Sequence, residues 1–177
     1  YLPNVNIVWN EAILGVELSN SDTPLSLTNV LIAGNKWRIG GGGIYNLRLS
    51  TTITNVTITG NYSDVAGGGI LNEFYIAEPT GANISLLSRE PTTLRIHNSI
   101  LWGNYASGDI ANKNIYNAGA FCLFSYSLAE GSSTPGFWEN NRNGGYMHGE
   151  NYLDMDPLFV EYIDPSSSEW GVTNKGD

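Results

Sequence analysis

The hydrophobic and polar residues of this chain follow a pattern of short strands separated by turns. Residues 56–59 read Val-Thr-Ile-Thr, with apolar and polar side chains alternating, and residues 60–61, Gly-Asn, end the run. Alternation with a period of two is typical of a strand with one buried face, and Gly-Asn favours a turn. A glycine cluster at 67–69 and a second short apolar run at 70–72 follow. We therefore expect small units of two or three short strands joined by turns.

This unit repeats along the chain. Residues 27–46 and 53–72 align at an offset of 26, with 11 of 20 residues identical. Repeats begin at Asn4, Asn29, Asn55, Asn98 and Tyr126, at spacings of 25, 26, 43 and 28 residues, and the last copy has diverged most. The third spacing contains 17 extra residues, which we assign to an insertion at 74–92. The insertion should leave the strands as a loop or a small hairpin, because the pattern resumes in phase at Thr93.

A unit of this size cannot bury its apolar face alone, so the repeats should stack on one another. Equivalent residues then lie one strand spacing apart, about 4.8 Å. Two ladders of side chains should point inward. The first ladder contains Val5, Val30, Val56 and Ser99, and the second contains Ile7, Ile32, Ile58 and Leu101.

Asparagine recurs at three positions of the repeat. The sets are Asn4, Asn29, Asn55 and Asn98; Asn10, Asn35, Asn61 and Asn104; and Asn20, Asn46, Asn72 and Asn117. Asparagine tolerates the left-handed backbone conformation, and its amide can bond to the copies above and below. Stacked asparagines are therefore typical of the corners of a β-solenoid, and three sets predict a roughly triangular outline.

Several of these sequence motifs resemble those of a known family. GGGI at 41–44 and ITGN at 58–61 resemble the GGxI and FxxN repeats of bacterial polymorphic outer-membrane proteins and related pectin-lyase-like proteins. NSILWGN at 98–104, YSLAEG at 126–131 and DPLFV at 156–160 are similar to the closing coils of Bacteroides-type surface β-helix proteins. The resemblance implies an all-β, right-handed parallel β-helix (β-solenoid) of about five coils over residues 1–131. An irregular C-terminal segment, 132–177, should close the stack with its aromatic residues.

The charge and composition of the chain exclude some classes of function. The 177 residues include 8 Lys and Arg against 17 Asp and Glu, a net charge of −9. This balance argues against nucleic-acid binding, which needs a basic face. The single cysteine, Cys122, excludes an intrachain disulfide and lies in an apolar run, so we expect a small buried side chain. No apolar run approaches the roughly 18 residues of a membrane span.

Two acidic residues occupy equivalent loops of neighbouring repeats. Asp64 and Asp109 follow the asparagines at 61 and 104, so stacking should bring them close together. Oxygen ligands of this kind suit a hard cation, and a Ca²⁺ site is one interpretation. A surface ion pair between Asp64 and Arg38, which stands at the same phase one repeat earlier, is the simpler alternative.

A second polar cluster lies near the C-terminus, at Arg142, His148, Glu150, Asp154 and Asp156. His148-Gly149 and the two aspartates are superficially similar to polygalacturonase motifs, but the other motifs of those enzymes are missing. We therefore interpret the cluster as loop structure, with Asp156 beginning a turn before Pro157. His97 stands at the phase of Thr28 and Thr54, which predicts a stacked polar side chain rather than a ligand.

Aromatic residues give the best indication of binding. Trp37, Tyr62 and Tyr105 follow the corner asparagines, and Trp102 should point outward because it alternates with the inward Leu101. Exposed aromatic rings on such a face stack on sugar rings, so Trp37, Trp102 and Tyr105 are candidate ligand-binding residues. Burial of Trp102 under the 74–92 insertion is the alternative.

We therefore expect a non-enzymatic segment of a bacterial surface or secreted β-helix protein, an adhesin or a spacer that binds a polysaccharide or a host glycan. The alternative is a polysaccharide lyase or glycoside hydrolase of the pectin-lyase-like fold. Convergence of three or more acidic or basic side chains in one solvent-facing groove would favour the enzyme. The chain begins and ends without a cap, so we also expect a fragment of a longer extracellular or outer-membrane protein whose coil ends contact another chain. No cofactor is expected apart from the Ca²⁺ interpretation.

Overall fold

The computed structural model describes residues 2–8, 11–12, 18–20, 24–38, 40–48, 50–74, 92–107, 113–139, 141–142 and 145–159. These residues form an all-β structure with parallel sheets and one short helix, α1 (Pro135–Glu139). In this part of the chain, no helix has the length and apolar character of a membrane span.

Four parallel sheets make up the fold, and we name them A to D. Sheet A contains, in spatial order, β1 (Leu2–Pro3), β5 (Leu25–Thr28), β9 (Thr51–Thr54), β13 (Thr93–His97), β17 (Phe121–Ser125) and β20 (Tyr146–Glu150). Sheet B contains β2 (Asn6–Val8), β6 (Leu31–Ala33), β10 (Thr57–Thr59), β14 (Ile100–Trp102) and β18 (Leu128–Ala129). Sheet C contains β3 (Glu11–Ala12), β7 (Lys36–Trp37), β11 (Tyr62–Ser63) and β15 (Tyr105–Ala106). Sheet D contains β4 (Leu18–Asn20), β8 (Ile44–Leu47), β12 (Ile70–Glu73), β16 (Ile115–Ala118) and β19 (Asn141–Arg142).

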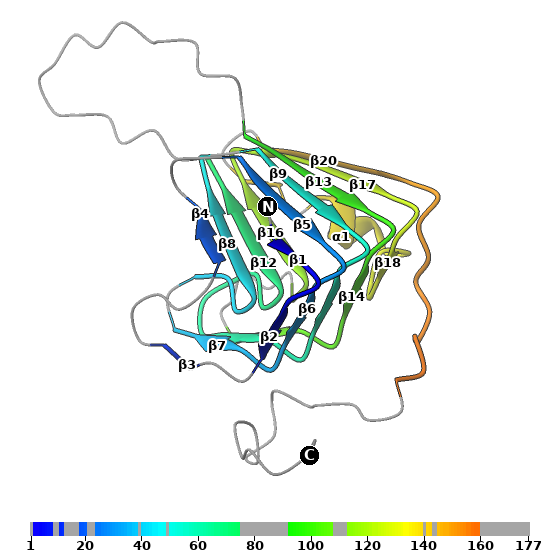
Figure 1. Cartoon of the computed structure of the whole chain (residues 1–177). Helices are drawn as coiled ribbons and strands as arrows, with labels where there is room; N and C mark the ends of the chain where they lie inside the picture. The colour runs from blue at the N-terminus through cyan, green and yellow to red at the C-terminus, as the bar shows by residue number, and fades with distance from the viewer. Residues whose placement is uncertain are drawn as a thin grey trace, which may run out of the picture.

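Each repeat contributes its strands to the sheets in the same order. The chain runs through β5, β6, β7 and β8, and the next repeat adds β9, β10, β11 and β12 beside them. Strands of successive repeats therefore lie side by side across the molecule, from blue to yellow in Figure 1. The spacing of 26 residues is thus the length of chain that returns to the same sheet.

The register predicted from the sequence is confirmed. Ile58 pairs with Ile32 on one side and with Leu101 on the other. His97 pairs with Thr54, so the phase is kept across the 43-residue spacing that contains the insertion. Residues 75–91, the body of that insertion, lie outside the described part of the chain.

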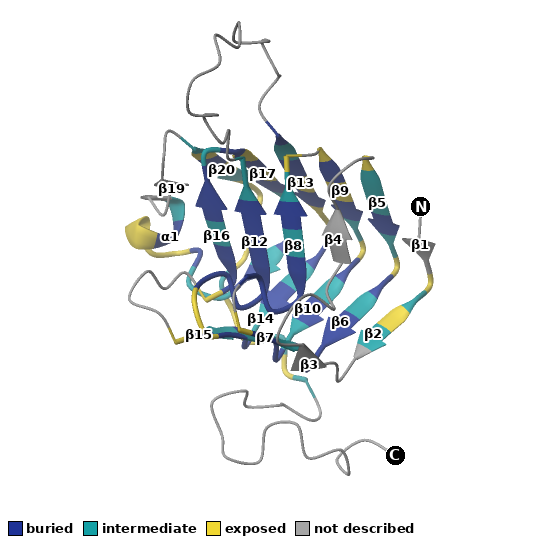
Figure 2. Cartoon of the chain, turned by 90° about the vertical axis from the view of Figure 1, so that its left-hand side faces the viewer, coloured by how far each residue is buried: buried dark blue, intermediate teal, exposed yellow. Residues whose placement is uncertain are grey.

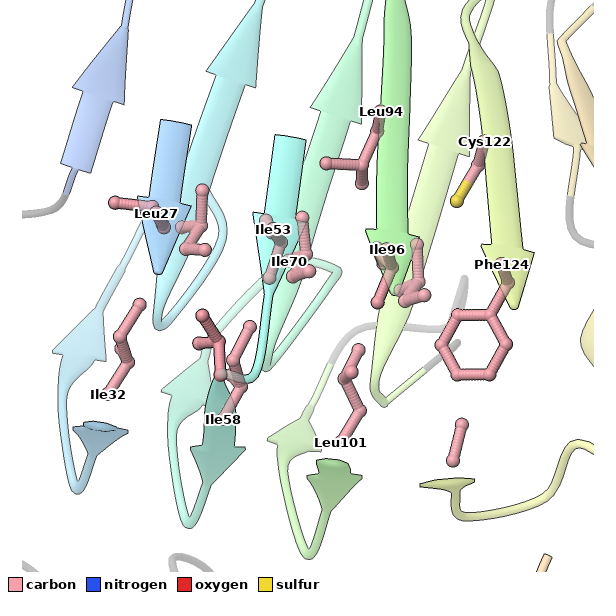
Figure 3. Close-up of a cluster of buried hydrophobic side chains, with 14 of the residues drawn as sticks. Leu27, Ile32, Ile53, Ile58, Ile70, Leu94, Ile96, Leu101, Cys122 and Phe124 are labelled. Atoms are coloured by element: carbon pink, nitrogen blue, oxygen red, sulfur yellow. The ribbon is translucent and has the colours of Figure 1, made fainter. Parts of the chain in front are cut away.

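The inward ladders form the hydrophobic core (Figure 3). Fully or almost fully buried side chains come from sheets A, B and D: Leu27, Ile53, Ile96, Phe124, Ile32, Ile58, Leu101, Ile44, Ile70 and Ile115. Val30, Val56 and Ser99 are also buried, as predicted, whereas Val5 and Ile7 at the first repeat are half-buried. Cys122 is fully buried, and this burial raises the pKa of its thiol to about 12.

The first asparagine set occupies the turn between sheets A and B. Asn4, Asn29, Asn55, Asn98 and Tyr126 all have positive φ, between 49° and 55°. The Nδ2 of Asn55 donates to Oδ1 of Asn29 at 3.2 Å, and Asn98 donates to Asn55 in the same way. The corner predicted at these positions is confirmed, including the divergent copy at Tyr126.

Four sheets are present where the asparagine sets predicted three sides. Asn46, Asn72 and Asn117 do not form a corner, because they lie inside the strands of sheet D and are buried. Figure 2 shows these strands, β8, β12 and β16, side by side with mostly buried residues. The additional turn comes from the glycine cluster between sheets C and D.

That glycine turn needs glycine because two backbones meet there. A Cβ on Gly42 would lie 2.3 Å from the carbonyl oxygen of Gly68, and a Cβ on Gly68 would lie 2.3 Å from that of Tyr105. No side chain fits at such distances, so the repeated glycines allow successive repeats to approach.

The C-terminal segment is more regular than expected. β19 and β20 add a further strand to sheets D and A, and Asn151 repeats the positive φ of the corner at 50°. Helix α1 follows β18, and its Phe137 is buried in the core. Trp138 lies against Phe124 and Gly149, so aromatic rings pack against the core here.

Candidate functional site

An open groove of about 550 Å³ lies on the outer face of sheet A. It spans strands β9, β13, β17 and β20, which lie side by side in Figure 1. Alternate residues of these strands point inward to the core, which leaves the others on the outer face. The groove is lined by Thr52, Thr54, Arg95, Ile96, His97, Leu123, Phe124, Ser125, His148 and Glu150.

The polar lining residues form two columns across the strands. In the first column Arg95 pairs with Thr52 and Leu123, and Leu123 pairs with His148. In the second column His97 pairs with Thr54 and Ser125, and Ser125 pairs with Glu150. Neighbouring strands are about 4.8 Å apart, so the four titratable side chains share one small surface. These are Arg95, His97, His148 and Glu150.

Contacts within the groove hold some of these side chains in place. The Nδ1 of His97 lies 3.0 Å from Oγ of Ser125, a hydrogen bond to the neighbouring repeat. His97 therefore has the stacked polar contact that its repeat phase predicts. Its ring also meets Tyr126 edge-on at 5.4 Å, and the His148 ring stacks at 6.1 Å with Tyr146.

Exposed aromatic rings stand at both ends of the groove. Phe121 and Tyr146 lie where the strands begin and are 37% and 49% exposed, with ring centroids 6.0 Å apart. Tyr126 follows the end of β17 and is 59% exposed. Such rings offer an apolar face to a ligand, while the polar columns between them offer hydrogen bonds.

The described lining of the groove has donors and acceptors but no pair of acids. Of the described residues that line it, Glu150 is the one carboxylate. Hydrolysis of a glycosidic bond ordinarily uses two carboxyl groups about 5–9.5 Å apart. The arrangement is therefore suited to holding hydroxyl or acidic groups, with Arg95 and the two histidines as donors.

The predicted cation site at Asp64 and Asp109 lies only partly within the described residues. Asp64 is exposed at the end of β11, and its backbone N donates to the carbonyl oxygen of Trp37 at 3.2 Å. Asp109 lies outside the described part of the chain. Among the described residues, no group of three or more His, Cys, Asp or Glu is arranged to hold a metal ion.

Trp37 does not lie where the sequence comparison placed it. It pairs with Ser63, and Lys36 is the residue that pairs with Tyr62. A shift of one residue moves a side chain to the other face of a strand, and Trp37 is accordingly buried, with 8% exposure. The ring fits because Gly40 has no side chain: a Cβ there would lie 1.8 Å from a Trp37 ring carbon. The expectation that Trp37 contacts a ligand at the surface is therefore wrong.

Tyr105 lies on the outer face of sheet C, but its ring is already engaged. It stacks on Tyr62 at 5.5 Å, and the Nζ of Lys113 lies 5.5 Å from its centroid. Lys36 lies over the Tyr62 ring at 5.3 Å, so lysines accompany both tyrosines. The hydrogen bond with Ser107 lowers the pKa of Tyr62, but burial and the nearby Asp64 outweigh it and raise the pKa overall. A sugar ring would have to displace these contacts to stack on Tyr105.

Trp102 lies on sheet B as predicted and is half-buried. It lines a separate hollow of about 410 Å³ together with Asp156, Leu158 and Phe159. The other three lining residues belong to the segment after β20. The alternative, that the 74–92 insertion covers Trp102, concerns residues 75–91, which lie outside the described part of the chain.

The C-terminal polar cluster is divided between different places. His148 and Glu150 line the groove on sheet A, and Asp156 lines the Trp102 hollow. The carboxylate of Asp154 accepts hydrogen bonds from the backbone N of Gly131 at 2.9 Å and of Ser133 at 3.0 Å. Burial tends to raise the pKa of Asp154, but these bonds and that from the Ser133 hydroxyl lower it overall. Arg142 lies in β19, in sheet D.

Sequence analysis missed Arg95 as a site residue. The alternation in Thr93-Leu94-Arg95-Ile96-His97 places Arg95 and His97 on one face of β13, and this signal was available. The side chains of Arg95 and His97 come near β20 because the repeats stack on one another. No protein-family model, curated protein or solved structure matches the chain, so its function has to be argued from the groove and the hollow themselves.

Proposed function

We propose that the chain is a segment of a right-handed parallel β-helix protein, exposed on a bacterial surface or secreted, whose sheet A binds a glycan without cleaving it. The observation that carries this proposal is the groove on sheet A. It combines Arg95, His97, His148 and Glu150 with exposed aromatic rings at both ends.

Support for the β-helix comes from the order of the strands. Successive repeats enter the four sheets in the same order, with parallel pairing throughout. Right-handed crossovers are the general rule for parallel strands in one sheet, which favours the right-handed form. The resemblance of the GGGI and ITGN phrases to bacterial surface proteins supports the proposed location.

Support for glycan binding comes from the shape and chemistry of the groove. Phe121 begins β17 and Tyr126 directly follows its end, five positions later, which is about 16 Å at the rise of a strand. An extended ligand of several units would therefore contact an aromatic ring at each end and the two polar columns between them. Hydroxyl groups of a sugar suit the Thr, Ser, His, Arg and Glu side chains of these columns.

A polysaccharide lyase is the second candidate. The convergence of Arg95, His97, His148 and Glu150 in one groove favours an acid–base role more than isolated surface residues would. A lyase would use a neutral imidazole to remove a proton next to a carboxylate that Arg95 neutralises. As the carbon–carbon double bond forms, the bond to the glycosidic oxygen breaks, and the second histidine would donate a proton to that oxygen. The single carboxylate of the described lining argues against a glycoside hydrolase.

One glycan panel tests both candidates. We expect saturable binding of at least one polysaccharide, weakened about tenfold or more by Arg95→Gln and by Tyr146→Ala, without release of sugar. Ser26→Ala is the matched control, because Ser26 pairs with Thr52 on sheet A but does not line the groove. Release of unsaturated sugar ends that is lost in His148→Ala would favour the lyase. Binding that survives every groove variant would contradict both candidates.

A further inference from the structure

The hollow at Trp102 has a lining that differs in chemistry from the groove on sheet A. Its described lining residues are Trp102, Asp156, Leu158 and Phe159, and the two sites share none of them. The volume of about 410 Å³ lies in the range of pockets for small ligands. Two aromatic side chains and a carboxylate therefore meet in a space large enough for a small organic group.

Within the described part of the chain, one oxygen of the Asp156 carboxylate is anchored by a backbone N–H. Its Oδ1 accepts a hydrogen bond from the backbone N of Leu158 at 2.8 Å. Asp156 is exposed, so the rest of the carboxylate faces solvent at the hollow. The hydrogen bond orients the group without neutralising its charge.

A second carboxylate, that of Glu130, directly follows the neighbouring strand β18. Leu101 pairs with Ala129, which places Glu130 beside Trp102. The Oε2 of Glu130 accepts a hydrogen bond from the backbone N of Gly103 at 2.9 Å, so this acid is held at the residue that follows Trp102. The described residues that line the hollow include no Lys, Arg or His.

These features together favour a cation. The face of an indole attracts a positive charge, and a ligand cation over Trp is the strongest form of this interaction. The net charge of −9 adds a long-range attraction for cations. A bare metal ion would not use the rings or Leu158, whereas an alkylated ammonium presents methyl groups to the apolar lining and its charge to Asp156.

We propose that the Trp102 hollow binds an alkylated ammonium group, held between the Trp102 and Phe159 rings with Asp156 as the counter-ion. This site is separate from the glycan-binding groove and does not depend on it. The same chemistry occurs in a choline headgroup and in a methylated lysine side chain of a partner protein, and the experiment distinguishes these two sources.

The test is a titration of the full chain with choline. Binding is monitored through the NMR signal of the Trp102 indole. Trp102→Phe identifies that signal, because it alone disappears. We expect saturable binding of choline and none at the same concentrations of 3,3-dimethyl-1-butanol, which has the same shape without the charge. Equal binding of the two compounds would overturn the proposal, as would the absence of any choline-dependent shift.

Variants with little effect on folding locate the site. Asp156→Asn keeps the acceptor for Leu158 and should weaken choline binding about fivefold or more, and Trp102→Phe should weaken it about threefold or more. Asp64→Asn removes the same charge from an exposed position on sheet C and should leave binding unchanged. Equal effects of Asp156→Asn and Asp64→Asn would mean that only the net charge matters, and would overturn the site.

The source of the ammonium group follows from a second comparison. A trimethyl-lysine peptide that binds at least tenfold more tightly than choline would support a protein partner. Equal affinities would support recognition of the headgroup alone. Tighter binding of an unmethylated lysine peptide than of either compound would overturn the role assigned to the methyl groups and to the aromatic rings.

Discussion

The side-chain amide of Asn61 donates a 2.9 Å hydrogen bond to Oδ1 of Asn104, a residue 43 positions later in the chain. The two residues occupy the same position in consecutive repeats, although the 74–92 insertion lies between them in sequence. Asn35 donates in the same way to Asn61 at 3.0 Å, and Asn104 continues the ladder to Asn114 at 2.8 Å. This buried ladder ties the turn between sheets B and C across successive repeats.

The first prediction concerns this ladder. Asn61→Ala should lower the free energy of unfolding by about 2–4 kcal/mol, because the partners of a buried amide are left without hydrogen bonds. These partners include the backbone N of Asn35 and the carbonyl oxygen of Ile32. Urea unfolding followed by circular dichroism measures the change.

The matched control for this variant is Asn55→Gly. Asn55 is an exposed asparagine of the corner ladder with a φ of 55°, a conformation that glycine adopts freely. We expect a loss below about 1 kcal/mol for it. Similar losses in the two variants would mean that burial of the amide has no special role.

The second prediction concerns close approach of the backbones. Gly68→Ala should destabilise the protein by about 2–4 kcal/mol, because the added Cβ would overlap the backbone of Tyr105 at 2.3 Å. Gly136→Ala is the control. Gly136 lies in helix α1, and a Cβ at this position would have no atom within 4 Å. It should leave stability unchanged or slightly raised. The thermal midpoints of the two variants measure this difference. Equal midpoints would contradict the prediction.

The third prediction concerns pH. The folded pKa of Asp154 is below its ordinary value, so its carboxylate stabilises the folded state at neutral pH. This contribution is present above the ordinary pKa of about 3.9 and is lost as the pH falls through the lower folded value. Asp154→Asn should therefore be less stable than the native chain at pH 7, and the difference should shrink below about pH 4.

Unfolding curves at several pH values between about 2.5 and 7 measure this convergence. Glu150→Gln, in which an exposed acid of the groove is neutralised, should not reproduce the profile. A difference between Asp154→Asn and the native chain that stays constant over this range would show that the carboxylate charge is not the cause.

The fourth prediction concerns the insertion. Replacement of residues 77–89 by a short linker should leave the sheets intact, because the repeats on either side are already in register. His97 pairs with Thr54, and Asn104 bonds to Asn61, without any part of the insertion. The β-type circular dichroism spectrum and a cooperative thermal transition should persist. Loss of both would show that the insertion belongs to the folded core.

The stacking of the repeats follows from the sequence alone. Side chains alternate with a period of two, and an unbroken phase from Ile32 through Ile58 to Leu101 leaves one register in which all three are buried. The corner at Asn29, Asn55 and Asn98 could be predicted for a similar reason, because few residues other than asparagine and glycine adopt positive φ without strain. Local conformation and burial decide both features.

The number of sheets and the places where side chains meet depend on the three-dimensional arrangement of the strands. Whether Trp37 points inward depends on a shift of one residue after the corner and on the space left by Gly40, and an alignment of the repeats shows neither. Arg95 and His148 line one groove, and Trp102 and Asp156 line one hollow, although each pair comes from distant parts of the chain. Such contacts depend on the order of strands in space, because backbone pairing between repeats, rather than proximity in sequence, brings these side chains together.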